Sequence, residues 1–254
     1  MRYRNRKYST ILLYGCFWVA ATAFADVTAT IDPAVKHQTI LGWGATASKG
    51  QISEYQLQRI VDAAVNELGL TRLRLEPPRR EWEDPFNDDA DANHIEWGAF
   101  KTGQTDRIIA NVIAPFKRLV EANGDPFNLY VSPSFFDGGS SGSAMPWMLK
   151  EPEEYAEWAT AYLLYLKNKH NITADYYCVC NEAGNNNAYS PQVVARMIKA
   201  LGPRLRAAGL PTRIEFPEGV NAATSWRYIQ QIQNDPDIWK YIGLVTYHLY
   251  GDAS

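Results

Sequence analysis

Short β-rich runs alternate with helical patterns along most of the chain, and this alternation restricts the fold more than any other feature. Between the β-rich runs, apolar residues recur at three- and four-residue steps, as they do in amphipathic helices. Strands that alternate with helices at this period are typical of βαβ units, which build a parallel sheet. We expect strands at 38–46, 71–76, 127–134, 176–182, 213–218 and 243–251, and helices at 52–68, 106–122, 152–168, 191–208 and 223–232.

Two parallel architectures, one open and one closed, fit this alternation. An open, nucleotide-binding sheet would have a glycine-rich phosphate loop after its first strand, and the segment LGWGATASKG from Leu41 lacks that spacing. A closed (β/α)8 barrel builds its active site at the C-terminal ends of its strands. We therefore predict an α/β fold, a (β/α)8 TIM barrel that is incomplete, with the first six strands present and the last two missing. Polar and aromatic residues gather at the expected strand ends, namely Trp43, Arg74, Glu76, Ser132, Ser134, Asn181, Glu182, Glu218, Tyr247 and His248.

The N-terminus has the three parts of a secretory signal peptide. A basic start precedes an apolar run from Ile11 to Ala21 and an A-x-A site at 23–25. The apolar run is shorter than the roughly 20 residues that span a bilayer. We predict that residues 1–25 are removed, that residues 26–254 form a partial catalytic barrel domain, and that the protein is secreted, either extracellular or periplasmic, without membrane contact after cleavage. A signal that remains as a membrane anchor is the alternative.

Charge and composition restrict the partners. Acidic and basic residues are interspersed and the formal net charge is −3, which argues against nucleic acid and against anionic membrane surfaces. Aromatic residues make up 13% of the chain, and aromatic rings on loops would suit flat ligands such as sugar rings. The oligomeric state is left open.

We expect no metal ion and no cofactor. Cys178 and Cys180 stand on one expected strand with parallel side chains, and this spacing lacks the further His and Cys ligands of a zinc site, so we interpret both as buried thiols. The DADAN segment from Asp89 resembles the start of a calcium loop. Its sixth position is His94 instead of glycine, however, and its twelfth is Phe100.

An almost wholly apolar run from Tyr176 ends at Asn181 and Glu182. A carboxyl group at the C-terminal rim of an apolar barrel strand is partly removed from water, which favours its protonated form and suits general-acid work. Asn181 can both donate and accept hydrogen bonds, as orienting a substrate hydroxyl requires. The alternative is that Asn-Glu simply begins a polar loop.

Six segments together resemble glycoside hydrolase family 30, within the clan of retaining (β/α)8 glycosidases. They are QTILGWGATAS, GLTRLRLE, YVSPS with MPWMLK, CVCNEAGN, FPEGVN and VTYHLYG, in the order and spacing of that family. The resemblance implies that Glu182 is the acid/base and that Asn181 contacts the sugar ring. Arg74 matches an arginine that the family has on its second strand, and His248 begins a match to the H-x-Y-G segment of the family's sixth strand. Glu218 is similar to a glutamate that follows proline at the end of the family's fifth strand.

The sequence also departs from the family pattern. Ala183 stands where proline is usual, and Ser134 where the third-strand loop often has tryptophan, with FFDGGSSGSA inserted before Trp147. The family's substrate preference is therefore not transferred. Trp43, Trp147 and Tyr247 are candidates to stack on sugar faces, with core packing as the alternative. The predicted substrate-binding residues are Asn181, Arg74, Trp43, Ser134, Trp147, Glu218, Tyr247 and His248.

The resemblance implies a retaining β-glycosidase that hydrolyses O-glycosidic bonds of a polysaccharide, oligosaccharide or glycoconjugate by double displacement. Glu182 would protonate the leaving oxygen and then activate water. The family's nucleophile is a glutamate at the end of the seventh strand, which we expect beyond Ser254, and Glu218 is expected to bind substrate or to hydrogen-bond. A carbohydrate-binding pseudoenzyme without hydrolytic activity is the alternative, and an unrelated α/β enzyme is a third possibility.

Overall fold

The computed structural model divides the chain into two units, residues 1–39 and 40–254. It describes residues 30, 32, 34–37, 39–47, 53–77, 88–133, 146–185 and 189–251. In the first unit, the Ala34 amide donates a hydrogen bond to the Asp32 carboxylate at 2.9 Å. The predicted signal peptide, residues 1–25, lies outside the described residues. Among the helices that the structure describes, none combines the length and the apolar composition that crossing a membrane requires.

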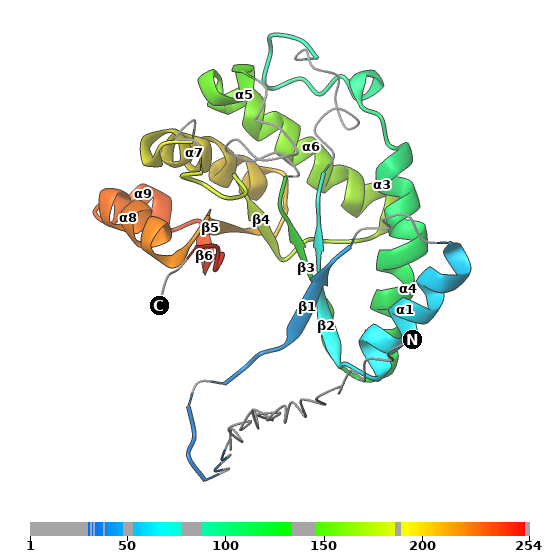
Figure 1. Cartoon of the computed structure of the whole chain (residues 1–254). Coiled ribbons are helices and arrows are strands. Elements are labelled where there is room, and N and C mark those ends of the chain that lie inside the picture. Colours follow the sequence, from blue (N-terminus) through cyan, green and yellow to red (C-terminus); the bar gives the residue numbers. More distant parts are fainter. Residues whose placement is uncertain are drawn as a thin grey trace, which may run out of the picture. The chain divides into compact units, whose positions relative to one another are not determined.

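The described part of the second unit is built on one sheet of six strands, which are all parallel and pair in sequence order (Figure 1). A doubly wound sheet would reverse its strand order, and this sheet does not. Each strand adds on the same side as the last, and the sheet curls into an arc (Figure 1). The predicted α/β fold with six parallel strands is confirmed, and the arc is consistent with an incomplete barrel. The strands are β1 Trp43–Thr46, β2 Leu70–Leu75, β3 Asn128–Val131, β4 Tyr176–Cys178, β5 Arg213–Gly219 and β6 Ile242–Tyr247.

Helices connect consecutive strands. The helix predicted at 106–122 begins earlier, at Gly103, and a π-helical stretch joins α3 to α4 within it. Two short helices, α5 and α9, were not predicted. The helices are α1 Glu54–Asn66, α3 Gly103–Ile108, the π-helical stretch η2 Ile109–Ile113, α4 Ala114–Ala122, α5 Pro146–Lys150, α6 Pro152–His170, α7 Pro191–Ala207, α8 Ala222–Ile232 and α9 Pro236–Trp239, with a 3₁₀ turn η1 at Trp97–Ala99.

Two helix starts follow capping residues in the sequence. At α1, the Ser53 hydroxyl accepts a hydrogen bond from the Gln56 amide at 3.3 Å, and the Gln56 side chain accepts one from the Ser53 amide at 3.1 Å. This reciprocal pair is a capping box. At α7, the Ser190 hydroxyl accepts from the Val193 amide at 3.3 Å, and Pro191 begins the helix. A proline at this position has no amide hydrogen to leave unsatisfied.

The two faces of the sheet differ in character, as β2 illustrates. Leu73 and Leu75 are buried, and helices α1 and α4 pack against this strand. Because successive side chains of a strand point to opposite faces, Arg72 and Arg74 point the other way, where they bond to side chains of the β3 segment. The apolar core therefore lies between the sheet and its helices, and the opposite face of the sheet is polar.

Helix α6 is buried over most of its length and packs on α7. Its Tyr155 side chain is fully buried, and the Tyr155 hydroxyl donates a hydrogen bond to the Val179 carbonyl at 2.8 Å and lies 3.1 Å from the Tyr177 hydroxyl. Val179 directly follows the residue that ends β4. The α6 helix thus holds the backbone just before Asn181 and Glu182.

We predict that Tyr155→Phe lowers the free energy of unfolding by about 1–3 kcal/mol, because the buried Val179 carbonyl loses this donor. Urea denaturation followed by circular dichroism would measure the change. Tyr55→Phe is the matched control, since Tyr55 lies on α1 and is 70% exposed. Equal stability losses in the two variants would contradict the assignment.

Candidate active site

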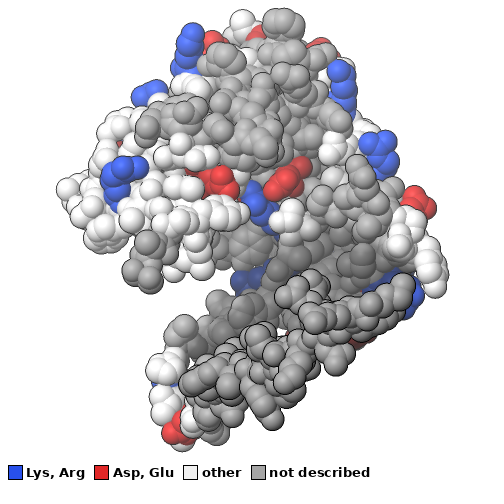
Figure 2. Space-filling model, viewed as in Figure 1, with Lys and Arg blue, Asp and Glu red and all other residues white. Residues whose placement is uncertain are grey.

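Polar side chains from five consecutive strands meet at the C-terminal edge of the sheet. Parallel strands all end at the same edge, so residues far apart in the sequence converge there. Near the middle of the described face, acidic and basic side chains lie next to one another (Figure 2). The converging residues are Arg74 on β2, Ser132 after β3, Asn181 and Glu182 after β4, Glu218 on β5 and His248 after β6.

Arg74 connects four of these strand ends. Its Nη2 donates hydrogen bonds to the Asn181 side-chain oxygen at 2.8 Å and to the Ser132 hydroxyl at 3.0 Å, and lies 3.4 Å from a Glu218 carboxylate oxygen. Its Nη1 lies 3.4 Å from the Glu76 carboxylate. Burial lowers the pKa of the Arg74 guanidinium, but the negative charges of Glu218 and Glu76 outweigh this effect and raise it. Arg74 is therefore a fixed positive charge at the centre of the site.

Glu218 is a buried carboxylate with several donors, and its side chain is only 5% exposed. One carboxylate oxygen accepts a hydrogen bond from the Ser132 hydroxyl at 2.7 Å, and the other lies within 3.4 Å of both Arg74 and His248. Burial alone would raise the pKa of Glu218, yet the hydrogen bond with His248 and the charge of Arg74 lower it. Glu218 is consequently held in its ionised form.

A bulge in β5 directs Glu218 to this face. Pro217 pairs with Thr246 and Gly219 pairs with Tyr247, so Glu218 is the extra residue between them. In a regular strand, Glu215 and a residue three positions later would point to opposite faces. The bulge turns Glu218 to the same face as Glu215, as bulges near active sites commonly do.

Glu215 is a second buried carboxyl group, and its chemical state differs from that of Glu218. Burial raises the pKa of Glu215, and the negative charge of Glu218 raises it further. The pair therefore consists of one ionised carboxylate and one carboxyl group that favours its proton. Opposite shifts in neighbouring carboxyl groups are typical of catalytic sites.

His248 bridges two acidic residues. Its Nδ1 lies 3.2 Å from a Glu182 carboxylate oxygen, and its Nε2 lies 3.4 Å from a Glu218 oxygen. The hydrogen bond with Glu218 raises the pKa of His248, although burial acts against it. An imidazolium donates from both ring nitrogens, so the protonated ring satisfies both contacts. The His248 amide donates to the Gly219 carbonyl at 2.9 Å, which fixes the ring next to β5.

The backbone is strained at both Glu182 and Glu218. Glu182 has φ 56° and Glu218 has φ 48°, and the third described non-glycine residue with positive φ, Asn171, is the C-cap of α6. A non-glycine residue in this left-handed region costs about 1–3 kcal/mol, and such strain gathers at functional sites. The Glu182 side chain is 14% exposed, so it lies at the border between the buried network and solvent.

The other predicted site residues have different positions. Trp43 was expected at the C-terminal end of a strand, and this expectation is wrong: β1 begins at Trp43, which pairs with Leu70 at the start of β2. The strand was predicted from Gln38, and its actual start lies five residues later, which shifts Trp43 to the opposite end. Tyr247 does end its strand, β6, and is 53% exposed.

Trp147 and Ser134 do not belong to the bonded network as described. Trp147 lies on α5 and packs against the apolar core, and its buried indole nitrogen has no hydrogen-bond partner within the described part of the chain. Ser134 lies outside the described residues. Cys178 and Cys180 are both buried, as predicted.

Sequence reasoning left two contributors out of the predicted site. Ser132 supplies a hydroxyl to Glu218, and Glu215 supplies the second buried carboxyl group. Ser132 had been noted as a strand-end residue, and that position was the signal for it. Glu215 is a charged residue in the middle of an apolar strand, which is a signal for an inward-facing polar group, but its proximity to Glu218 depends on the bulge.

No protein-family model matches the chain, and no curated protein sequence matches it. Solved structures do match. SrfJ from Salmonella typhimurium is 18% identical with a TM-score of 0.60, over 84% of this chain and 51% of that one. The family 30 subfamily 8 xylanase Xyn30A from Clostridium acetobutylicum is 21% identical with a TM-score of 0.56, over 87% of this chain and 52% of its own.

Xylanase C of family 30 from Talaromyces cellulolyticus, as its catalytic domain, is 17% identical with a TM-score of 0.59, over 87% of this chain and 55% of that one. This chain therefore spans about half the length of each of these three structures. At these identities the likeness shows the fold alone, which is of the glycosidase type.

We predict that His248→Asn destabilises the protein more at low pH than at high pH. The pKa of His248 is raised on folding, so its contribution is fully present below the unfolded value, near pH 6.5, and is lost as the pH rises through the folded value. The stability difference from wild type should reach about 1–2 kcal/mol near pH 5.5 and shrink near pH 9. Urea denaturation at both values measures it. A difference that grows with pH would refute the bridging role.

Proposed function

We propose that this chain is part of a retaining β-glycosidase that hydrolyses O-glycosidic bonds of a polysaccharide, oligosaccharide or glycoconjugate. The observation that supports it most is the His248 bridge between Glu182 and Glu218 at the C-terminal strand ends of a glycosidase-type fold. Hydrolysis with retention requires an acid/base carboxyl group at the substrate, and this bridge holds Glu182 at the strand ends, where barrel enzymes have their active sites.

Glu182 has the role of acid/base in this proposal. It lies at the solvent border of the network, where a leaving oxygen and then a water molecule can reach it. The Nδ1 atom of His248 lies 3.2 Å from the Glu182 carboxylate and can orient it by a hydrogen bond. Asn181 accepts a hydrogen bond from Arg74 through its side-chain oxygen, so its NH2 group is directed away from Arg74 and is available for a sugar hydroxyl.

Glu218 binds and orients in this proposal, and another residue attacks. One of its carboxylate oxygens accepts a hydrogen bond from Ser132, and the other lies within ion-pair distance of Arg74 and His248. The Glu218 side chain is 5% exposed. A carboxylate used in this way is a poor nucleophile for an anomeric carbon. The family resemblance assigns the nucleophile to a seventh strand, so the proposal places it beyond Ser254, about 5–5.5 Å from Glu182.

The proposal includes a carbohydrate substrate and export of the protein. Arg74, His248 and Glu218 form the polar wall of the substrate site, and Tyr247 offers an exposed ring at the end of β6 for stacking on a sugar. Ser134, which follows β3 in the sequence, and Trp147 are proposed for the same wall. Residues 1–25 act as the signal peptide and direct the protein to the periplasm or the cell exterior.

Glu182→Gln tests this proposal in the protein expressed to the end of its reading frame. We predict that the variant loses about 10²–10⁴-fold in kcat/KM on natural glycosides, whose leaving groups need a proton, and far less on activated aryl β-glycosides. Glu67→Gln is the matched control, because Glu67 is exposed at the end of α1. Its activity should equal that of the wild type.

Three outcomes decide between the candidates. Equal losses on both substrate types would remove Glu182 as general acid. A wild-type protein that binds oligosaccharides and hydrolyses none would favour the carbohydrate-binding pseudoenzyme. A downstream strand that ends in glutamate would support the hydrolase.

A further inference from the structure

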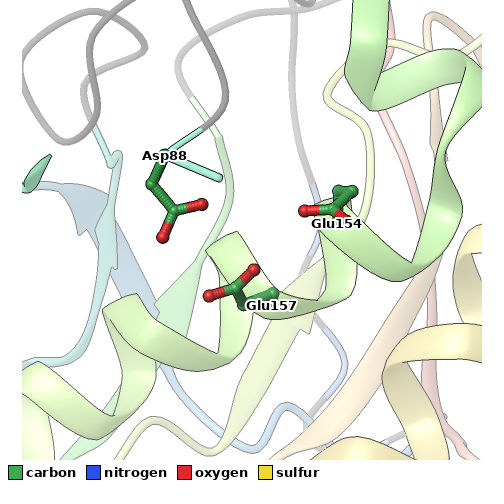
Figure 3. Close-up of side chains that lie close together, drawn as sticks. All are labelled: Asp88, Glu154 and Glu157. Atoms are coloured by element: carbon green, nitrogen blue, oxygen red, sulfur yellow. The ribbon is translucent and has the colours of Figure 1, made fainter. Parts of the chain in front are cut away.

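A second cluster of carboxyl groups lies apart from the Arg74 network. Asp88, Glu154 and Glu157 each offer one oxygen, and these oxygens all lie within 4.8 Å of one another. Figure 3 shows the three carboxyl groups turned toward a common space between the Asp88 segment and the first turns of α6. Glu154 and Glu157 are three positions apart on α6, so they share a helix face.

The Asp88 carboxylate is held in place by its own segment. One oxygen accepts a hydrogen bond from the Glu96 amide at 3.0 Å, and the other accepts from the Asp89 amide at 2.9 Å. These bonds fix a compact turn, and they leave lone pairs on both oxygens. The side chain is half-buried and faces α6 in Figure 3.

Glu157 is the member that most needs a cationic partner. Glu157 is only 2% exposed, and its Oε1 is buried without a hydrogen-bond partner among the described residues. Buried carboxylate oxygens are almost always satisfied by a donor or an ion. Burial and, to a smaller extent, the charge of Asp88 together raise the pKa of Glu157 to about 8.

Arg204, a cation among the described residues near Glu157, does not offset the effect of burial on Glu157. The charge of Arg204 lowers the pKa of Glu157, but burial outweighs it, and the Arg204 Nη1 donates to the Glu153 carbonyl at 2.9 Å. Glu154 stands in the first turn of α6, where the helix dipole stabilises an acid. Glu157 lies beyond that turn, so the helix dipole does not stabilise a negative charge on Glu157 in the same way.

We propose that Asp88, Glu154 and Glu157 bind one calcium ion, which ties the segment before η1 to α6. Calcium takes six to eight oxygen ligands at about 2.3–2.6 Å, so two ligands across the ion lie at most about 5 Å apart. The 4.8 Å limit within the cluster satisfies this condition. All three candidate ligands are carboxylate oxygens, which calcium prefers. Zinc sites are instead built mainly from nitrogen and sulfur ligands.

This site is distinct from the DADAN loop and departs from the expectation that the protein binds no metal. The Asp89 carboxylate lies 2.6 Å from the His94 ring and also accepts from the Asp91 amide, and Asp91 accepts from Asn93. Those acidic groups serve local turns. The calcium proposal does not depend on the proposed glycosidase activity, since no residue of the Arg74 network takes part.

Calcium binding to the purified protein tests the proposal. We predict that calcium at a hundredfold excess over its dissociation constant raises the melting temperature of the wild type by about 5–10 °C. Glu157→Gln should lose this rise and should melt no lower than wild type in chelator, because glutamine is close in size to glutamate and burial already disfavours the ionised form of Glu157. Glu153→Gln, at an exposed acid in the first turn of α6, should keep the rise.

Terbium luminescence excited through tryptophan and equilibrium dialysis with calcium measure binding directly, so they do not depend on stability. Asp88→Asn, at a half-buried position, should weaken binding and serves as the second variant if Glu157→Gln does not fold. The absence of calcium binding to the wild type would overturn the proposal. Equal binding by wild type and both variants, or tighter binding of magnesium than of calcium, would do the same.

Discussion

The half-buried guanidinium of Arg74 makes the contacts on which the rest of the site depends. One side chain on β2 contacts Ser132, Asn181 and Glu218, which follow or belong to the next three strands. Removing water from several carboxylate and amide oxygens costs free energy, unless a fixed positive charge replaces the hydrogen bonds that water made to them. Arg74 supplies that charge, and the geometry of the four strand ends follows from its donors.

The same charge separates the chemical states of the acidic residues. Glu218 next to Arg74 and His248 is ionised despite its burial, whereas burial and the charge of Glu218 favour the proton on Glu215. Among the described residues, the Glu182 side chain contacts the network through His248, and it stays at the solvent border. The half-buried charge of Arg74 thus lies among acidic side chains with different environments at the ends of neighbouring strands, which is the basis for the proposed acid/base chemistry.

Side chains that alternate along a strand point to opposite faces of the sheet, so residues that pack in the core and residues that form the polar site lie on different faces. Along β2, Leu73 and Leu75 pack under the helices, while Arg72 and Arg74 reach the polar face. Helix α6 also has two roles. Its Tyr155 supports the backbone before Glu182, and its Glu157 faces the proposed calcium site. In both elements, some side chains stabilise the fold and others are available for binding.

The sequence by itself determined the alternation of six strands and five main helices, the parallel sheet, and Asn181 and Glu182 at a strand end, because these depend on local periodicity and on where apolar runs stop. It could not determine the exact start of β1, and so misplaced Trp43. Only the tertiary structure decided that a bulge brings Glu218 beside Glu215, that His248 joins Glu182 to Glu218, and that Asp88 meets Glu154 and Glu157. Those contacts join residues that are distant along the chain or depend on a shift of one position, and local patterns contain no information on either.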